Sequence, residues 1–433
     1  MRNDNIKTVA AVLLALAALV LLFTRNGTAA AEAEGSLELQ SLIDEALKNN
    51  RELLVAESRW RAATYRVPQA RSLPDPMVMV GYQNEGWDEY TFGRMEGAQW
   101  MYSVSQMFPF PGKRGLKGEM AERDAESIEA SNRALRLRTV STVKELYYDL
   151  FRTYKDIDLV HDRTSLFSRI EAAAVARYSS GMAPQQEVLM AQTEKYMLLE
   201  RETMLKQKLQ SLETMLNTAV GRNANSPLGR PSEPAPTAFS YSLDEISAIA
   251  TERAPEIRSR ARMTASADAR VNMARKEYFP DMTLAASVFK RTGEFEDMWS
   301  LTATFNIPLY FGTKGQAVLE ARSLSSEATH ELEAGRLMVA SSIRDNFSML
   351  TAAEKLMELY KQGLIPKTYQ DVESAMAGYS AGRVEAITVI TRLKALLDYE
   401  TLYWAQFVER EKAIARIEAV AGIGDAGTTE KTE

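Results

Sequence analysis

The chain carries an internal duplication, and this feature restricts its fold more than any other. Four landmarks recur in the same order at a spacing of about 200 residues. They are Asn-Arg-Glu-Leu at 50–53 and Ala-Pro-Glu-Ile at 254–257, Trp100 and Trp299, Pro-Phe-Pro-Gly-Lys at 109–113 and Pro-Leu-Tyr-Phe-Gly at 308–312, and Tyr-Ser-Ser-Gly at 178–181 and Tyr-Ser-Ala-Gly at 379–382. The sequence therefore predicts two structural repeats, 36–222 and 239–423, joined by a linker at 223–238 that is rich in Pro, Ser, Asn and Gly.

Each repeat is predicted to be mainly helical. No glycine or proline occurs from Glu119 to Ser180, and apolar residues recur there every three or four positions. A helix of roughly 60 residues would be about 90 Å long, a length typical of coiled coils and long tubes. In the second repeat we expect a break or kink near Pro366, because its ring removes a backbone donor. Shorter helices, 39–71 and 243–278, are expected to open the repeats.

Two segments in each repeat have the period-two pattern of β-strands. Along 299–306, apolar and polar residues alternate strictly, and 100–105 alternates in a similar way. The expected partner strands are 77–82 and 283–289, and the connecting loops, 83–98 and 290–297, are polar and acidic. Such strands predict a sheet with one apolar and one polar face, as in a transmembrane β-barrel. An ordinary antiparallel sheet on a soluble core is the alternative.

The number of strands indicates how a barrel would form. Four strands cannot close one, since eight is about the smallest transmembrane closure. Three chains would supply twelve strands. The barrel interpretation therefore implies oligomerisation, and three chains would also supply twelve long helical segments.

The N-terminus has the pattern of an export signal. Arg2 and Lys7 are basic, Val9 to Phe23 form an apolar run, and small residues follow near Ala31. The run is short for a membrane-spanning helix, which favours a cleaved signal peptide at 1–31 over an uncleaved anchor. The C-terminal stretch 424–433 is small and polar, and we expect a disordered tail.

Composition excludes several classes of function. The chain has no cysteine, which excludes disulfides, thiolate metal sites and a lipid-carrying N-terminal cysteine. The formal net charge of -6 argues against nucleic acid as a partner. His161 and His330 have no ligands near them at metal-site spacing. The 20 methionines fit apolar packing better than a soft-metal site. We therefore expect no catalytic residues, no cofactor and no bound metal.

The duplicated order of opening helix, hairpin, Pro-x-Pro-Gly-Lys, long helix and Tyr-x-x-Gly resembles the TolC outer-membrane efflux family. The likeness covers essentially the whole mature chain and is strongest at 105–113, 365–366 and 379–383. The Pro-Gly-Lys-Arg form of 111–114 is more similar to the heavy-metal branch than to the drug branch. The resemblance implies a homotrimer in the outer membrane of a Gram-negative bacterium, with a twelve-stranded β-barrel that continues into a periplasmic α-helical barrel. Its β-barrel would contact lipid, and its periplasmic helices would dock on an adaptor and an inner-membrane pump.

The resemblance also implies roles for particular residues. Trp100 and Trp299 would belong to an aromatic girdle of the barrel. The strand-to-helix crossovers would be formed by Pro109, Pro111, Gly112, Pro308 and Gly312. The periplasmic tips that meet the adaptor would include Ser180, Gly181, Met182, Ser380, Ala381 and Gly382.

A gate at the periplasmic tips is implied as well. Glu187 and Tyr379 stand where well-known members have an acidic residue bonded to a tyrosine. Thr388 and Thr391 replace acidic residues that narrow the pore in those members, so the carboxylate rings have no counterpart here. Arg383 follows its glycine by one position, whereas the arginine of those members follows by two. For Glu187 and Arg383, a solvated helix face is the alternative.

The function predicted on this basis is a passive exit duct for small molecules or metal ions. A non-transporting periplasmic coiled-coil scaffold is the alternative, and it leaves the alternating strands and the duplication unexplained. No pattern of serine, histidine and acid supports an enzyme.

Overall fold

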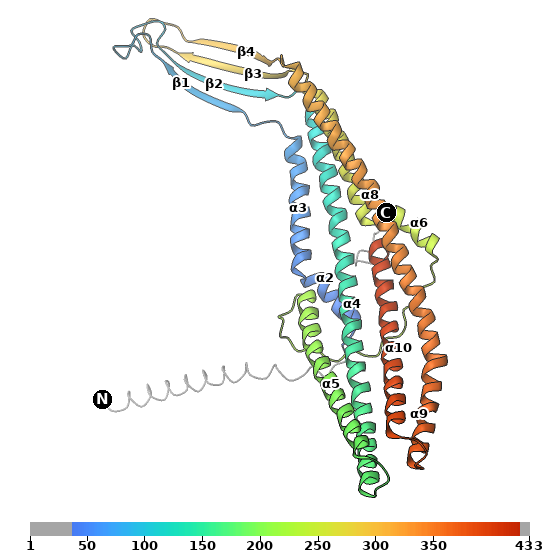
Figure 1. Cartoon of the computed structure of the whole chain (residues 1–433). Helices are drawn as coiled ribbons and strands as arrows, with labels where there is room; N and C mark the ends of the chain where they lie inside the picture. Colours follow the sequence, from blue (N-terminus) through green and yellow to red (C-terminus); the bar gives the residue numbers. More distant parts are fainter. Residues whose placement is uncertain (1–36, 425–433) are drawn as a thin grey trace, which may run out of the picture. The chain divides into compact units, whose positions relative to one another are not determined.

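The computed structural model describes residues 37–424, so the predicted signal peptide and nearly all of the predicted tail lie outside the described part. The first half contains α2 (Leu39–Asn49), α3 (Arg51–Arg71), β1 (Met77–Gln83), β2 (Gln99–Phe108), α4 (Lys113–Ser179) and α5 (Gln185–Val220). The second half contains α6 (Leu243–Arg253), α7 (Pro255–Lys276), β3 (Asp281–Lys290), β4 (Met298–Asn306), α8 (Phe311–Glu358), the π-helix η1 (Leu359–Leu364), α9 (Ile365–Ser380) and α10 (Ala386–Ala421). The order of elements thus repeats once (Figure 1). Within residues 37–424, no helix has a stretch that is both long and apolar enough to cross a lipid bilayer.

The opening helix of each repeat is divided, which the sequence analysis did not predict. In the first repeat, Asn50 separates α2 from α3, and its Oδ1 accepts from the N–H groups of Glu52 (2.9 Å) and Leu53 (3.1 Å). This side chain caps α3 by satisfying two donors that the helix itself leaves free. In the second repeat, Pro255 starts α7 directly after α6, because proline has no N–H to continue the earlier helix.

The predicted break near Pro366 takes the form of a π-helix. Pro366 lies in the first turn of α9 and cannot donate a backbone hydrogen bond. The six residues before α9 form η1, and the N–H of Ile365, which follows η1, donates to the carbonyl of Tyr360, five residues earlier. The wider hydrogen-bonding pattern lets the helix continue through the proline.

The described residues form two compact units, each with its own core. The helical unit comprises residues 37–46, 143–237 and 354–408, and the sheet unit comprises 47–142, 238–353 and 409–424. The long helices α4, α8 and α10 contribute to both. The core of the helical unit packs apolar side chains of α4, α5, α9 and α10, among them Phe167, Ile170, Leu198, Val372, Ile390 and Leu393. The core of the sheet unit packs α6, α7, α8 and the end of α10, with Ile246, Ile257, Ile343, Leu350, Ile414 and Ile417.

The predicted linker is ordered against the helical unit. Leu37 pairs with Pro231 in a short parallel bridge, and the Leu37 N–H donates to the carbonyl of Arg230 at 3.0 Å. The buried Tyr147 hydroxyl lies 3.2 Å from the carbonyl of Leu37 and 3.4 Å from that of Ser232. Tyr147 therefore holds the start of the described chain and the linker together.

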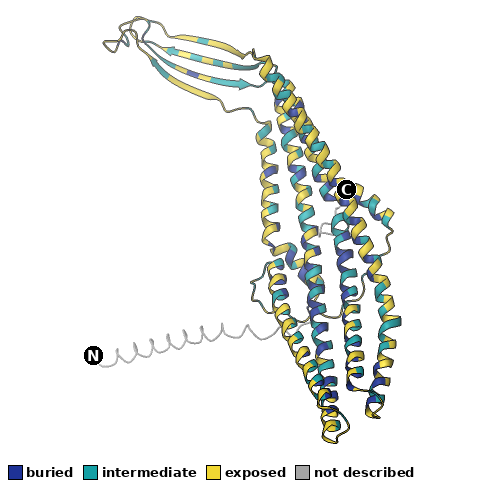
Figure 2. Cartoon of the chain, in the orientation of Figure 1, coloured by how far each residue is buried: buried dark blue, intermediate teal, exposed yellow. Residues whose placement is uncertain are grey.

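The four strands form one antiparallel sheet in the order β1-β2-β3-β4, as the alternating pattern predicted. The register places all the valine, leucine, tyrosine and tryptophan side chains of the four strands on one face. This face carries Val78, Val80 and Tyr82 of β1, Trp100, Tyr102, Val104 and Phe108 of β2, Met282, Leu284, Ala286 and Val288 of β3, and Trp299, Leu301, Ala303 and Phe305 of β4. The opposite face is mixed: its serine, threonine and other polar residues alternate with Ala285, Phe289 and the methionines at 77, 79, 101, 107 and 298. Both faces of the sheet are largely uncovered in the single chain (Figure 2).

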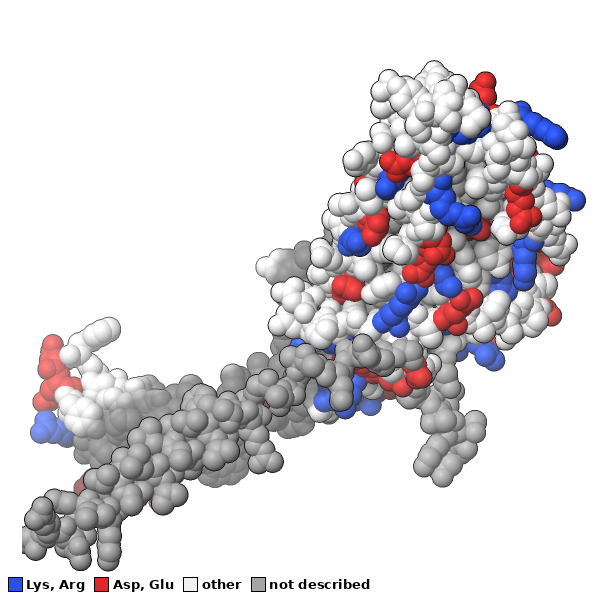
Figure 3. All heavy atoms as spheres, turned by 90° about the horizontal axis from the view of Figure 1, so that it is seen from below, with Lys and Arg blue, Asp and Glu red and all other residues white. Residues whose placement is uncertain are grey.

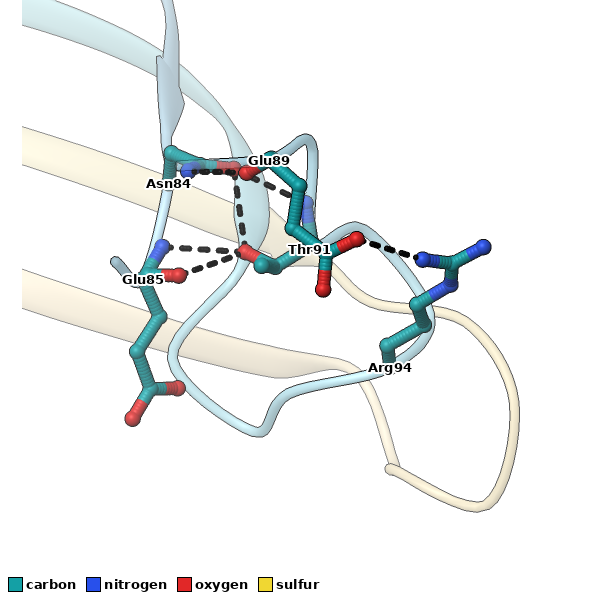
Figure 4. A network of polar contacts seen from close by, with 5 residues as sticks. All are labelled: Asn84, Glu85, Glu89, Thr91 and Arg94. Atoms are coloured by element: carbon teal, nitrogen blue, oxygen red, sulfur yellow. Dashed lines mark hydrogen bonds and ion pairs between the residues drawn. The ribbon is translucent and has the colours of Figure 1, made fainter. Parts of the chain in front are cut away.

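The loop between β1 and β2 is ordered by a polar network. Thr91 is buried (Figure 4). Its N–H and its hydroxyl each donate to Asn84 Oδ1 at 3.0 Å. The Asn84 amide donates to the carbonyls of Gly86 and Glu89, and Arg94 forms an ion pair with Glu89. Most residues of this polar loop are exposed, and several of its polar side chains bond to one another.

A buried ion pair joins the two halves where strands meet helices. Lys113 opens α4 and is only 3% exposed, and its Nζ lies 2.9 Å from Asp281 Oδ1 and donates to the carbonyl of Phe279 at 3.0 Å. Asp281, the first residue of β3, also accepts from the N–H of Phe110 at 2.7 Å. Phe110 and Phe279 stack beside the pair with centroids 4.5 Å apart. The end of the first hairpin is thus fixed to the start of the second.

Replacing Lys113 with alanine is expected to destabilise the sheet unit by about 3 kcal/mol, because it leaves a shielded carboxylate without its partner. The unfolding midpoint at a fixed heating rate, followed by circular dichroism, measures the effect. Lys314, its counterpart in the second repeat, is one-third exposed and lies 3.7 Å from Glu277. Lys314→Ala is therefore the control and should cost about 0.5 kcal/mol or less. Equal effects of the two substitutions would contradict this account.

Candidate functional site

Both Tyr-x-x-Gly segments end a helix with the same geometry. Gly181 and Gly382 have φ values of +72° and +71°, a conformation that glycine adopts without strain. After α4, the N–H of Met182 donates to the carbonyl of Arg177; after α9, that of Arg383 donates to the carbonyl of Gly378. These are Schellman motifs, which stop a helix and turn the chain sharply. All six predicted tip residues are exposed: Ser180, Gly181, Met182, Ser380, Ala381 and Gly382.

The two tyrosines of these turns have different surroundings. Tyr178 is 48% exposed, whereas Tyr379 is 3% exposed in the core of the helical unit. The Tyr379 hydroxyl donates to Glu187 Oε2 at 3.3 Å, across α9 and α5. Glu187 lies in the first turn of α5 and is itself buried, so the solvated-face alternative is wrong for this residue. The helix N-terminus favours its negative charge.

Arg177 completes this arrangement, and the sequence analysis missed it. Its guanidinium lies 4.6 Å from the centre of the Tyr379 ring, and its Nη1 donates to the Tyr379 carbonyl at 3.1 Å. Arg177 stands directly before the first Tyr-x-x-Gly, where the second repeat has Gly378. That difference between the repeats was the available signal. We call Arg177, Glu187 and Tyr379 the Tyr379 cluster.

The charges of the cluster affect the tyrosine. Burial and the adjacent Glu187 carboxylate raise the pKa of Tyr379 above the ordinary tyrosine value, and Arg177 opposes them in part. The phenol therefore keeps its proton, and its ability to donate, to higher pH than a solvated tyrosine.

The remaining gate candidates lie outside the cluster. Arg383 is exposed in the turn between α9 and α10, so it lies on no helix face, and Arg177 rather than Arg383 is the cation at Tyr379. Thr391 is exposed and donates to the carbonyl of Ile387 within α10, and Thr388 is half-buried. On the molecular face shown in Figure 3, acidic and basic side chains are interspersed, without a large patch of one sign.

The girdle and crossover candidates lie in the sheet unit. Trp100 and Trp299 share the apolar face; Trp100 packs against Tyr82, and Trp299 is 74% exposed. The two crossovers differ in structure. Gly112 has a φ of +93° at the turn after Pro109 and Pro111, whereas Gly312, which follows Pro308, is already part of α8. Among residues 37–424, no three histidine, aspartate or glutamate side chains gather closely enough to hold a metal ion.

Comparison with known proteins gives the same family along most of the chain. The model of the outer membrane efflux protein family matches residues 42–222 and 247–397. The cobalt-zinc-cadmium resistance protein CzcC of Cupriavidus metallidurans is 21% identical over 90% of this chain and 91% of its own length. The nickel-cobalt-cadmium resistance protein NccC of Alcaligenes xylosoxydans is 24% identical over 78% of this chain and 75% of its own.

Solved structures show the same fold. The outer membrane protein VceC of Vibrio cholerae superposes with a TM-score of 0.76 at 18% identity, covering 89% of this chain and 96% of that one. The scaffold alternative has no support from these likenesses. The chain belongs to the outer membrane efflux protein family, a family of channels and not of enzymes, and is an outer-membrane efflux channel.

Proposed function

We propose that the working channel is a homotrimer whose three sheets close into a twelve-stranded β-barrel, with the long helices forming a helical barrel in the periplasm. The observation that carries this proposal is the sheet. Its outer strands, β1 and β4, each have one edge without a partner in the described chain. An even number of strands per chain allows β4 of one copy to pair antiparallel with β1 of the next, so the closed ring has no free edge.

The faces of the sheet support the same assembly. Strands of 9 or 10 residues, as in β2, β3 and β4, match the length of a tilted membrane-spanning strand. Aromatic residues stand at both ends of the apolar face, with Tyr82 and Trp100 beside the loops and Phe108 and Phe305 beside the helices. The apolar face would meet lipid, and the serine- and threonine-bearing face would line the water-filled duct.

A trimer of this kind is expected to resist detergent. Unheated protein in SDS should migrate as a compact trimer and heated protein as a monomer, because a closed barrel has no free strand edges. The substitution Thr302→Pro, in the middle of β4, removes a backbone donor and should abolish the trimer band of the unheated protein. A monomer band from well-folded unheated protein would contradict the proposed closure.

We further propose that the Tyr379 cluster holds the tips closed. It joins α4 and α5 to the end of α9 through one hydrogen bond to a carboxylate, one cation–π contact and one backbone contact. A hydrogen bond to a charged group contributes about 1.5 to 3 kcal/mol. Loss of the bond would therefore shift the balance between closed and open tips at least tenfold. The exposed Schellman turns beside the cluster would meet the periplasmic adaptor.

Single-channel conductance in a planar bilayer tests this gate. Glu187→Ala and Tyr379→Phe should each increase the fraction of time spent in the larger conductance about tenfold. Tyr178→Phe is the matched control, since Tyr178 occupies the equivalent position but is exposed, and its conductance should equal that of the wild type. A gate elsewhere would leave all three variants unchanged.

Alkaline pH should open the same gate. Because the closed state raises the pKa of Tyr379, the preference for that state is constant below the ordinary tyrosine pKa of about 10 and decreases as the pH rises above it. Conductance of the wild type should thus increase above about pH 10. In Tyr379→Phe, this alkaline increase should be absent, and its persistence would assign the transition to another group.

We propose metal cations as the exported substrate. Two of the relatives are named for resistance to cobalt, zinc, cadmium or nickel. Deleting the gene for this chain should lower the tolerated cadmium, zinc or cobalt concentration severalfold and leave tolerance of hydrophobic drugs unchanged. Complementation with the wild-type gene should restore tolerance, whereas complementation with a variant that forms no trimer, such as Thr302→Pro, should not. Sensitivity to drugs alone would favour the drug-export alternative.

A further inference from the structure

An apolar hollow lies where the apolar face of the sheet ends. It has a volume of about 550 Å³ and is lined by Phe108, Phe110, Met282 and Phe305, three prolines, Gly112 and Arg114. Phe108, Met282 and Phe305 form the last row of the apolar sheet face on the side of the helices. The hollow therefore continues the surface that we assign to lipid.

A second, smaller hollow adjoins the first and is basic. Gly112 lines both, and the second is completed by Leu116, Asn272, Arg275, Lys276 and Phe279. Lys276 lies over the rings of Phe110 and Phe279 at 5.5 and 5.8 Å. Its Nζ would lie 3.4 Å from a side-chain carbon built on Gly112, so the ammonium stands at the boundary between the two hollows.

The cations here have no anionic partner within the described chain. Neither Arg275 nor Lys276 forms an ion pair with residues 37–424. The Arg114 guanidinium donates to the carbonyl of Arg71 at 2.6 and 3.0 Å, which orients it and leaves its charge uncompensated. Elsewhere in the sheet unit, Lys113, Lys290 and Arg291 are each paired with a carboxylate.

The level of this site matches a membrane boundary. Phe279, Tyr310 and Phe311 are 46%, 83% and 60% exposed and directly flank the strands on the helix side. Aromatic residues of this kind gather at the headgroup level of bilayers. An acyl chain therefore fits the apolar hollow, and an anionic headgroup beside it would face Lys276 and Arg275.

We propose that the two hollows bind one anionic phospholipid of the inner leaflet of the outer membrane, with its phosphate on Lys276 and Arg275 and an acyl chain against Phe108, Met282 and Phe305. The proposal rests on the assignment of the sheet to a membrane barrel.

Native mass spectrometry of the purified, delipidated trimer tests the proposal with phosphatidylglycerol as the anionic probe and phosphatidylethanolamine as the neutral one. Phosphatidylglycerol should bind up to one molecule per chain. Lys276→Gln should weaken its binding about fivefold and Arg275→Gln/Lys276→Gln further still. Lys290→Gln, which removes one charge at the opposite end of β3, should leave binding unchanged. Met282→Glu should abolish the preference for phosphatidylglycerol over phosphatidylethanolamine, although Lys276 is intact.

The alternatives have distinct outcomes. Equal binding of both lipids, or equal effects of the Lys276 and Lys290 substitutions, would overturn the site. Displacement of the lipid by an equal concentration of inorganic phosphate would make it a free-anion site and also overturn the proposal. If every variant keeps the heat-modifiable trimer but none binds lipid selectively, the lipid site fails and the trimeric channel stands. If no trimer forms, the channel proposal itself fails.

Discussion

The ion pair between Lys113 and Asp281 is the contact on which the sheet unit depends. Each residue is the first of its element, so the pair fixes where α4 and β3 begin relative to each other. The chain leaves β2 and enters α4 at the same place where it leaves α7 and enters β3. An ion pair with so little access to solvent tolerates little displacement, because separation would leave Asp281 a shielded carboxylate without its cation and Lys113 with only the longer contact to Glu277 at 3.6 Å. It therefore gives the two halves of a duplicated chain a single register, with Phe110 stacked on Phe279 beside it.

Much of this fold could be predicted from the sequence because the patterns are long and occur twice. The alternating residues of 299–306 identify β4 almost to the residue, and the run without glycine or proline identifies α4. The points at which the opening helices are divided could not be predicted in the same way. The division of each opening helix depends on one side chain, Asn50, in the first repeat and on one missing N–H, at Pro255, in the second. Neither interrupts the apolar periodicity on which the helix predictions were based.

The candidate site was only partly predictable for a different reason. Glu187 and Tyr379 were found through a resemblance, and the structure brings them within 3.3 Å. Arg177 could not be found in that way, because its contact with Tyr379 depends on how two helices far apart in sequence pack. The duplicated motif does not point to Arg177, because the two turns share their backbone geometry. The repeats differ in the residue before each tyrosine, which is Arg177 in the first and Gly378 in the second. The backbones of the two turns are thus alike, whereas the surroundings of their tyrosines differ, since only Tyr379 is buried.

The unpaired edges of β1 and β4 have a consequence for the life of the protein before assembly. A single chain presents two rows of free backbone donors and acceptors beside a broad apolar surface, which is a template for pairing with any other extended chain. In the proposed trimer these edges are paired, so the stability of each chain would depend on the concentration of its own copies. A chain that has not yet met its partners would be the form of the protein most exposed to aggregation.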